Sequence, residues 1–144
     1  MIRRLDDWPA RLRRFLEDRK RTPFAWGRND CCLFAADAVL AITGTDAAAA
    51  WRGYRTARGA ATRLDRHGGV AGLMREAAAA HGWAEILPAF ARRGDVVLLV
   101  HPAPRHAVDA LGIVDLSGRR AAVPDADGLA AVPLIQAVTA WRIG

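Results

Sequence analysis

The most constraining feature of the chain is the apolar segment from Cys31 to Thr43, which contains no Gly or Pro. As a helix, this segment would be apolar on nearly every side, so it would have to be buried on more than one side. Asn29 or Asp30 can cap its first turn by accepting bonds from the orphan N–H groups there. Gly44 can end it, because glycine readily takes a positive φ. The sequence therefore predicts a central helix around which the rest of the chain packs.

Further helices are predicted on both sides of this segment. One begins near Trp8-Pro9, since proline suits the first helical position. Trp8, Leu12, Phe15 and Leu16 share one face of it, and arginines occupy the others. Residues 45–82 predict shorter helices in three stretches: TDAAAAW, ARGAATRLDRHGG and VAGLMREAAAAHG.

From Trp83 onward the pattern changes from helical to extended. ARRGDVVLLV predicts a turn followed by a strand of β-branched and aliphatic residues. Turns at Ser117-Gly118 and Asp127-Gly128 divide the next stretch into three short strands, and AVTAWRIG predicts a last strand. Helices followed by antiparallel strands indicate an α+β fold, with a β-meander or small barrel, and residues 1–144 are expected to form a single domain.

The formal charge of the chain is +6, and residues 1–21 carry eight basic side chains against four acidic ones. Such a segment suits an anionic partner, or it is a solvated helix face. It lacks the apolar core of a signal peptide, which indicates synthesis in the cytoplasm. No apolar run reaches the roughly 18 residues of a membrane span. Aromatic and basic residues are not interleaved and no DNA-binding motif occurs, so nucleic-acid binding is the least favoured function.

The two cysteines of the chain, Cys31 and Cys32, are adjacent. Neighbouring cysteines form only a strained disulfide, and their spacing does not suggest zinc, so free thiols without a metal or cofactor are expected. At the first turn of a helix, the helix dipole and free N–H groups favour a Cys31 thiolate and could hold an oxyanion. Cys32 points about 100° away and is expected to pack in the core. The alternative is that both are small core residues.

The segment PFAWGRNDCCLFAAD, followed by RRGDVVLLV and ALGIVD, resembles the NlpC-type cell-wall cysteine peptidases, and in particular a small family of bacteriophage and prophage tail proteins that end in an AWR strand. The resemblance covers most of the chain and implies a papain-like fold. It implies that Cys31 is the catalytic nucleophile and that Trp26, Gly27 and Asp30 shape the substrate-binding pocket. Gly94-Asp95 matches the turn that opens the sheet.

The histidine that these peptidases carry before the Gly-Ile strand has no counterpart, because Ala110 occupies its position. In these peptidases a third polar residue orients the histidine. Its place in this chain is near Val123-Pro124, where no obvious match stands. His106 is the candidate replacement, but in a regular strand it would lie roughly 13 Å from Ala110, beyond the ~3 Å reach of a general base. A bulge or a folded-back loop could bring His106 or His101 to Cys31. The other two histidines are interpreted as helix ends: His67 and His81.

These observations leave two main functions open. In the first, the chain is a tail-associated hydrolase, a cysteine peptidase or amidase that cuts peptidoglycan peptides through a thioester on Cys31. In the second, the same fold is a non-catalytic structural or assembly component that contacts other tail-tip or baseplate proteins, and Ala110 favours this one slightly. Both imply that the chain becomes a virion component, within a phage or phage-like tail. A basic nucleic-acid-binding module is the remaining alternative.

Overall fold

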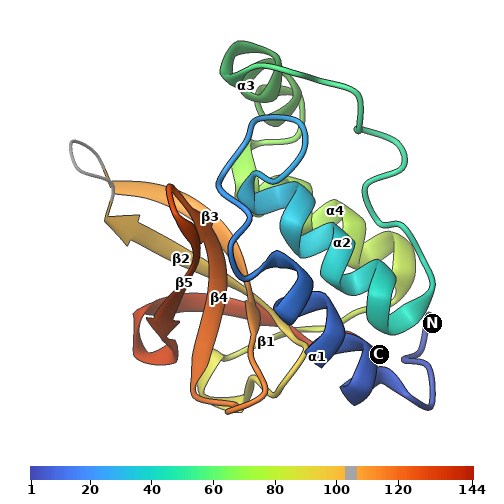
Figure 1. Ribbon diagram of the computed structural model, residues 1–144. Coiled ribbons are helices and arrows are strands. Elements are labelled where there is room, and N and C mark those ends of the chain that lie inside the picture. The colour runs from blue at the N-terminus through green and yellow to red at the C-terminus, as the bar shows by residue number, and fades with distance from the viewer. Residues whose placement is uncertain (103–106) are drawn as a thin grey trace.

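The structure is a computed structural model that describes residues 1–102 and 107–144, and within them it confirms the predicted α+β fold (Figure 1). The helices gather on one side of a six-stranded antiparallel sheet. The helical elements are α1 (Trp8–Arg19), α2 (Cys31–Thr43), α3 (Ala57–Arg66), α4 (Gly69–His81) and the 3-10 turns η1 (Pro88–Phe90) and η2 (Leu134–Gln136). The strands are β1 (Glu85–Ile86), β2 (Val96–Pro102), β3 (Ala107–Val114), β4 (Arg120–Asp125), β5 (Gly128–Pro133) and β6 (Ala137–Trp141).

Helix α2 is the central element, as its apolar pattern predicts. Asp30 is its N-cap, and the side chain accepts a hydrogen bond from the Leu33 amide at 3.0 Å. Gly44 ends the helix with φ of 78°. Leu33, Phe34 and Ile42 are at most 1% exposed, and full burial of such a side chain contributes about 1.5–3 kcal/mol. The helix therefore positions its own N-terminus firmly against the rest of the fold.

The sheet is not a simple meander. Its order is β1-β6-β2-β3-β4-β5, so β2 to β5 follow the predicted meander while β6 returns to the other edge of β2. There Ala140 and Trp141, both buried, pair with Val97 and Val96. The two-residue strand β1, which the sequence did not predict, adds to the outer edge of β6.

Both faces of the sheet are buried. One face packs on α2 through alternate residues such as Val96, Leu98 and Leu111. The other face forms a second cluster made only of strand residues, including Leu99 and Val123. Strand residues can bury one another in this way only if the sheet curls on itself. Cys31 packs against both clusters and so lies at the seam between them.

The helix predicted from TDAAAAW is wrong. Residues 47–51 form turns, and the Asp46 side chain accepts a hydrogen bond from the Ala48 amide at 3.0 Å while it pairs with Arg52. A short carboxylate side chain that bonds nearby backbone competes with helix formation. Trp51 is nevertheless buried, so the segment is held by its tertiary contacts. In the described part of the chain, no helix is both long and apolar enough to cross a membrane.

Asp95 ties the two ends of the chain to the start of β2. Its side chain is fully buried and accepts hydrogen bonds from the Arg4 guanidinium at 2.8 Å and the Arg142 guanidinium at 3.1 Å. The amides of Arg92 and Ile143 donate to the same carboxylate. This buried charge is thus fully paired, which is the condition under which such a group is tolerated.

Asp95→Ala should lower the free energy of unfolding by about 3–5 kcal/mol, because it leaves two guanidinium groups without the carboxylate that they surround. Urea denaturation measures this. Asp7→Ala, which removes the exposed partner of Arg11, is the matched control and should leave the unfolding midpoint almost unchanged. Equal midpoints for the two variants would contradict the anchoring role of Asp95.

Candidate functional site

A tight turn leads the chain into α2. Gly27 has φ of 77°, and its amide donates to the Asp30 carboxylate at 3.0 Å. A β-carbon at Gly27 would lie 2.1 Å from the carbonyl oxygen of Tyr54. Glycine is therefore required here on two grounds, the left-handed backbone and the close approach of another segment.

The Asp30 carboxylate joins three segments. It accepts hydrogen bonds from the amides of Gly27 and Leu33, and from the Tyr54 hydroxyl at 2.6 Å. Burial raises the pKa of Tyr54 well above its ordinary value, and the bond to Asp30 adds to the shift. The phenol therefore keeps its proton at neutral pH and acts as a donor, which excludes it as a general base.

Cys31 and Cys32 divide between them the two roles that the sequence left open. Cys31 is the first residue of α2 and is half-buried, whereas Cys32 is only 5% exposed and packs in the core. Their Sγ atoms lie 3.9 Å apart, within reach of a hydrogen bond. Cys31 is thus the cysteine better placed to meet a ligand.

The hydrogen bond between the two thiols has opposite effects on them. It lowers the pKa of Cys31, although burial opposes this; the backbone amide of Leu111 lowers the pKa further. The same bond raises the pKa of Cys32 well above its ordinary value, and burial adds to it. When one of the two thiols loses its proton, Cys31 therefore becomes the thiolate and Cys32 stays protonated.

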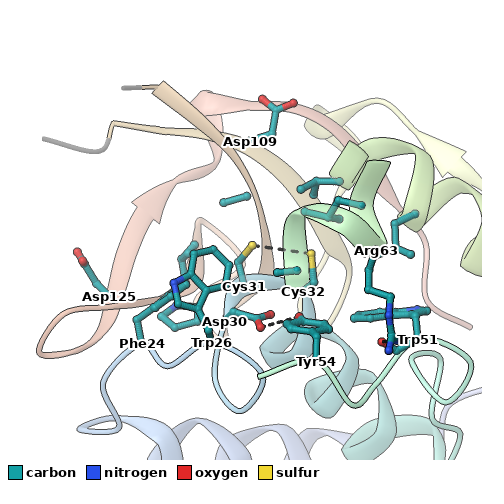
Figure 2. A pocket seen from close by; sticks show the side chains of 17 residues that line it. Phe24, Trp26, Asp30, Cys31, Cys32, Trp51, Tyr54, Arg63, Asp109 and Asp125 are labelled. Carbon is teal, nitrogen blue, oxygen red and sulfur yellow. Dashed lines mark hydrogen bonds between the residues drawn. The ribbon is translucent and has the colours of Figure 1, made fainter. Parts of the chain in front are cut away.

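A pocket with a volume of about 290 Å³ lies beside Cys31 (Figure 2). Phe24 and Trp26 stand on one side with their ring centroids 4.8 Å apart, edge to face, and Trp51 and Arg63 stand on the other. Trp26 is 45% exposed, so its ring borders the opening. Aliphatic side chains contribute much of the remaining wall: Ala60, Leu64, Val70, Leu73 and Val123.

The pocket exists because β3 and β4 separate. Their pairing is limited to Ile113 with Ala122 and Val114 with Ala121. Continued by two residues, this register would place Leu111 opposite Pro124, whose nitrogen carries no hydrogen for the ladder. The ladder stops before that pair, and the Leu111 backbone there helps to lower the pKa of Cys31.

The position of the expected histidine forms part of this pocket wall. Ala110 lies on β3, is 6% exposed and borders the pocket together with Asp109. His106 lies outside the described residues. Two other histidines have partners elsewhere: His67 bonds Glu76 and His81 stacks on Trp83. Among the described pocket residues there is no imidazole.

Of the residues that the sequence singled out, Trp26, Asp30 and Cys31 border the pocket and Gly27 shapes the turn behind it. Tyr54 was missed, although it is the only tyrosine of the chain, because nothing in its neighbourhood links it to Asp30. The described residues contain no group of three or more His, Cys, Asp or Glu side chains arranged to hold a metal ion.

Gly27→Ala should destabilise the protein by about 2–5 kcal/mol, because left-handed strain of about 1–2 kcal/mol is joined by a clash that costs about 1–3 kcal/mol. Gly69→Ala is the control, since Gly69 has φ of 84° but open space around its α-carbon. It should lose only the strain. If urea denaturation gives equal losses, the contact between Gly27 and Tyr54 does not constrain the turn.

Cys31 should react with iodoacetamide faster than an ordinary thiol near pH 7, with a rate midpoint below the ~8.5 of a free cysteine. In Cys32→Ala the midpoint should rise, because the thiolate loses its hydrogen-bond donor. In Cys31→Ala the remaining thiol should be almost unreactive, because it is only 5% exposed and its burial still raises its pKa. Mass spectrometry of the alkylated peptides over a pH series measures all three, and a midpoint unaltered by Cys32→Ala would refute the role of the Cys32 hydrogen bond.

Comparison with known proteins adds one match. No curated protein matches the chain. A family model described as a domain of unknown function, DUF6950, matches residues 3–143 and so spans both α2 and the whole sheet. The region around Cys31 and the strands that border its pocket are therefore part of a shared domain. On this match, the chain belongs to the DUF6950 family.

Proposed function

We propose that this chain is a papain-like, NlpC-like domain of a phage or prophage tail, and that Cys31 accepts an acyl group from a cell-wall peptide bound in the adjacent pocket. The observation that carries the proposal is the position of Cys31: at the N-terminus of a buried helix, half-buried itself, and beside a pocket between two separated strands. A nucleophilic cysteine needs this combination of lowered pKa and access.

The reaction follows from the groups around the sulfur. The Cys31 thiolate attacks the carbonyl carbon of an amide, the carbon–nitrogen bond breaks as a thioester forms, and the amine leaves with a proton taken from solvent water. Water then hydrolyses the thioester and regenerates the thiol. The amides of Cys31 and Cys32 lie at the positive end of the helix dipole and suit the oxyanion of each step. The apolar pocket walls lower the local dielectric constant and so strengthen these interactions.

Protonation of the leaving amine has no protein donor among the described pocket residues. In the described pocket wall, Ala110 stands where the resemblance expects an imidazole, and the Tyr54 hydroxyl is committed to Asp30. General acid–base catalysis contributes typically 10²–10⁴-fold. Hydrolysis without it is expected to be slow.

The lack of an imidazole among the described pocket residues favours a second candidate function. An NlpC-like domain without its histidine can serve as a structural component of the tail that holds a neighbouring chain. Its stable core does not depend on catalysis, because the central helix and the curled sheet are buried independently of the pocket. The basic segment 1–21 would then supply the contact with an acidic partner.

Ala110→His separates the two functions. Restoring an imidazole in a pocket that has space for it should raise the rate of release of peptides from purified peptidoglycan by at least about tenfold. The gain in rate should increase with pH as the introduced histidine, whose ordinary pKa is near 6.5, loses its proton. Chromatography of the released fragments measures it.

Ala110→Asn is the matched control, because it adds a polar side chain that cannot shuttle a proton at neutral pH. Cys31→Ala in the Ala110→His background should abolish any gain. If Ala110→His folds, as judged by circular dichroism, and still releases no more peptide than Ala110→Asn, the catalytic proposal is wrong and the structural function stands.

A further inference from the structure

A second pocket, with a volume of about 340 Å³, lies where the two ends of the chain meet. Four arginines and one tryptophan define it, and we call it the arginine pocket: Arg4, Arg92, Arg93, Arg142 and Trp8. It adjoins the C-terminal end of α2, since a β-carbon at Gly94 would contact Ile42 and the Leu5 amide bonds the Ile42 carbonyl. Cys31 begins the same 13-residue helix, which is about 20 Å long, so the two pockets lie near its opposite ends.

The inner arginines are held in place by fixed partners. Arg4 donates to the Asp95 carboxylate and to the carbonyl oxygens of Arg93 and Ile143. Arg142 donates to Asp95 and to the carbonyl of Phe90. Their geometry is therefore set before any ligand arrives, which lowers the entropic cost of binding.

The outer arginines have no carboxylate partner among the described residues. Arg92 and Arg93 are both exposed. The guanidinium carbon of Arg93 lies 5.6 Å from the centre of the Trp8 ring. The Arg4 guanidinium lies over the same ring at 4.3 Å. Trp8 thus forms an aromatic floor that orients two cations.

The pocket has more positive than negative charge. Four guanidinium groups surround it, and among the residues that the structure describes Asp95, buried behind them, is the carboxylate that pairs with Arg4 and Arg142. Burial lowers the pKa of Arg4, Asp95 opposes that shift, and the charges of Arg142 and Arg92 add to it. Arginines on a solvated helix face spread apart; here they converge on one hollow despite their repulsion.

We propose that the arginine pocket binds an anion that carries phosphate groups. Guanidinium groups bind the oxygens of phosphate in a two-pronged geometry, and a group with two or more negative charges would neutralise the excess positive charge. The volume equals that of about ten water molecules at roughly 30 Å³ each, which suits a phosphate ester or a pyrophosphate group. This proposal does not depend on the function of Cys31.

Isothermal titration calorimetry of the full chain with inorganic pyrophosphate tests the proposal. The unmodified protein should bind one pyrophosphate saturably at low ionic strength. The double variant Arg92→Gln/Arg93→Gln removes two charges and keeps both backbone positions, and its affinity should fall by at least about tenfold. Arg58→Gln/Arg66→Gln, which removes two exposed charges from α3, is the matched control and should bind as tightly as the unmodified protein.

Thermal unfolding should show that both double variants are folded, since all four side chains are exposed. Three outcomes would overturn the proposal: no saturable binding of pyrophosphate, equal loss of affinity in both variants, or binding of a short DNA duplex that is as tight as that of pyrophosphate and weakened equally by both variants. The last of these would mean that the whole basic surface attracts polyanions without a specific pocket.

Discussion

The buried carboxylate of Asp30 is the interaction on which the candidate site depends. It binds the turn through Gly27, the first turn of α2 through Leu33, and the loop before α3 through Tyr54. One charge thus determines where the helix begins and how the aromatic loop approaches it. Because the helix begins at the next residue, Cys31 occupies the position where the dipole and the free amides act most strongly. The capping contact thus fixes the position of the sulfur at the start of the helix.

The pair of adjacent thiols shows how one sequence feature can serve both packing and chemistry. Cys32 fills the core and keeps its proton, and Cys31 gains a hydrogen-bond donor that is already buried in place. The Leu111 backbone, at the place where the β3–β4 ladder ends, lowers the pKa of Cys31 from a distant part of the chain. Helix and sheet therefore act together on a single sulfur atom.

The features predicted correctly from the sequence are those that local pattern determines. The apolar run with Asp30 before it and Gly44 after it specified α2, and the turn residues Ser117-Gly118 specified the β3–β4 hairpin. The features missed depend on contacts between distant segments. Asp46 bonds locally and prevents a helix that alanines alone would favour. The return of β6 to the edge of β2, and the bond from Tyr54 to Asp30, join segments that no local signal relates.

The proline in β4 has a lasting consequence for the pocket. Its backbone nitrogen carries no hydrogen in any conformation, so the bond that Pro124 would donate to Leu111 cannot form and the β3–β4 ladder is weakened beyond Ala122. The gap between the two strands therefore has its origin in the covalent structure of the chain, and it is present before any ligand binds. Evolution could alter the side chains along this gap while the opening itself persisted.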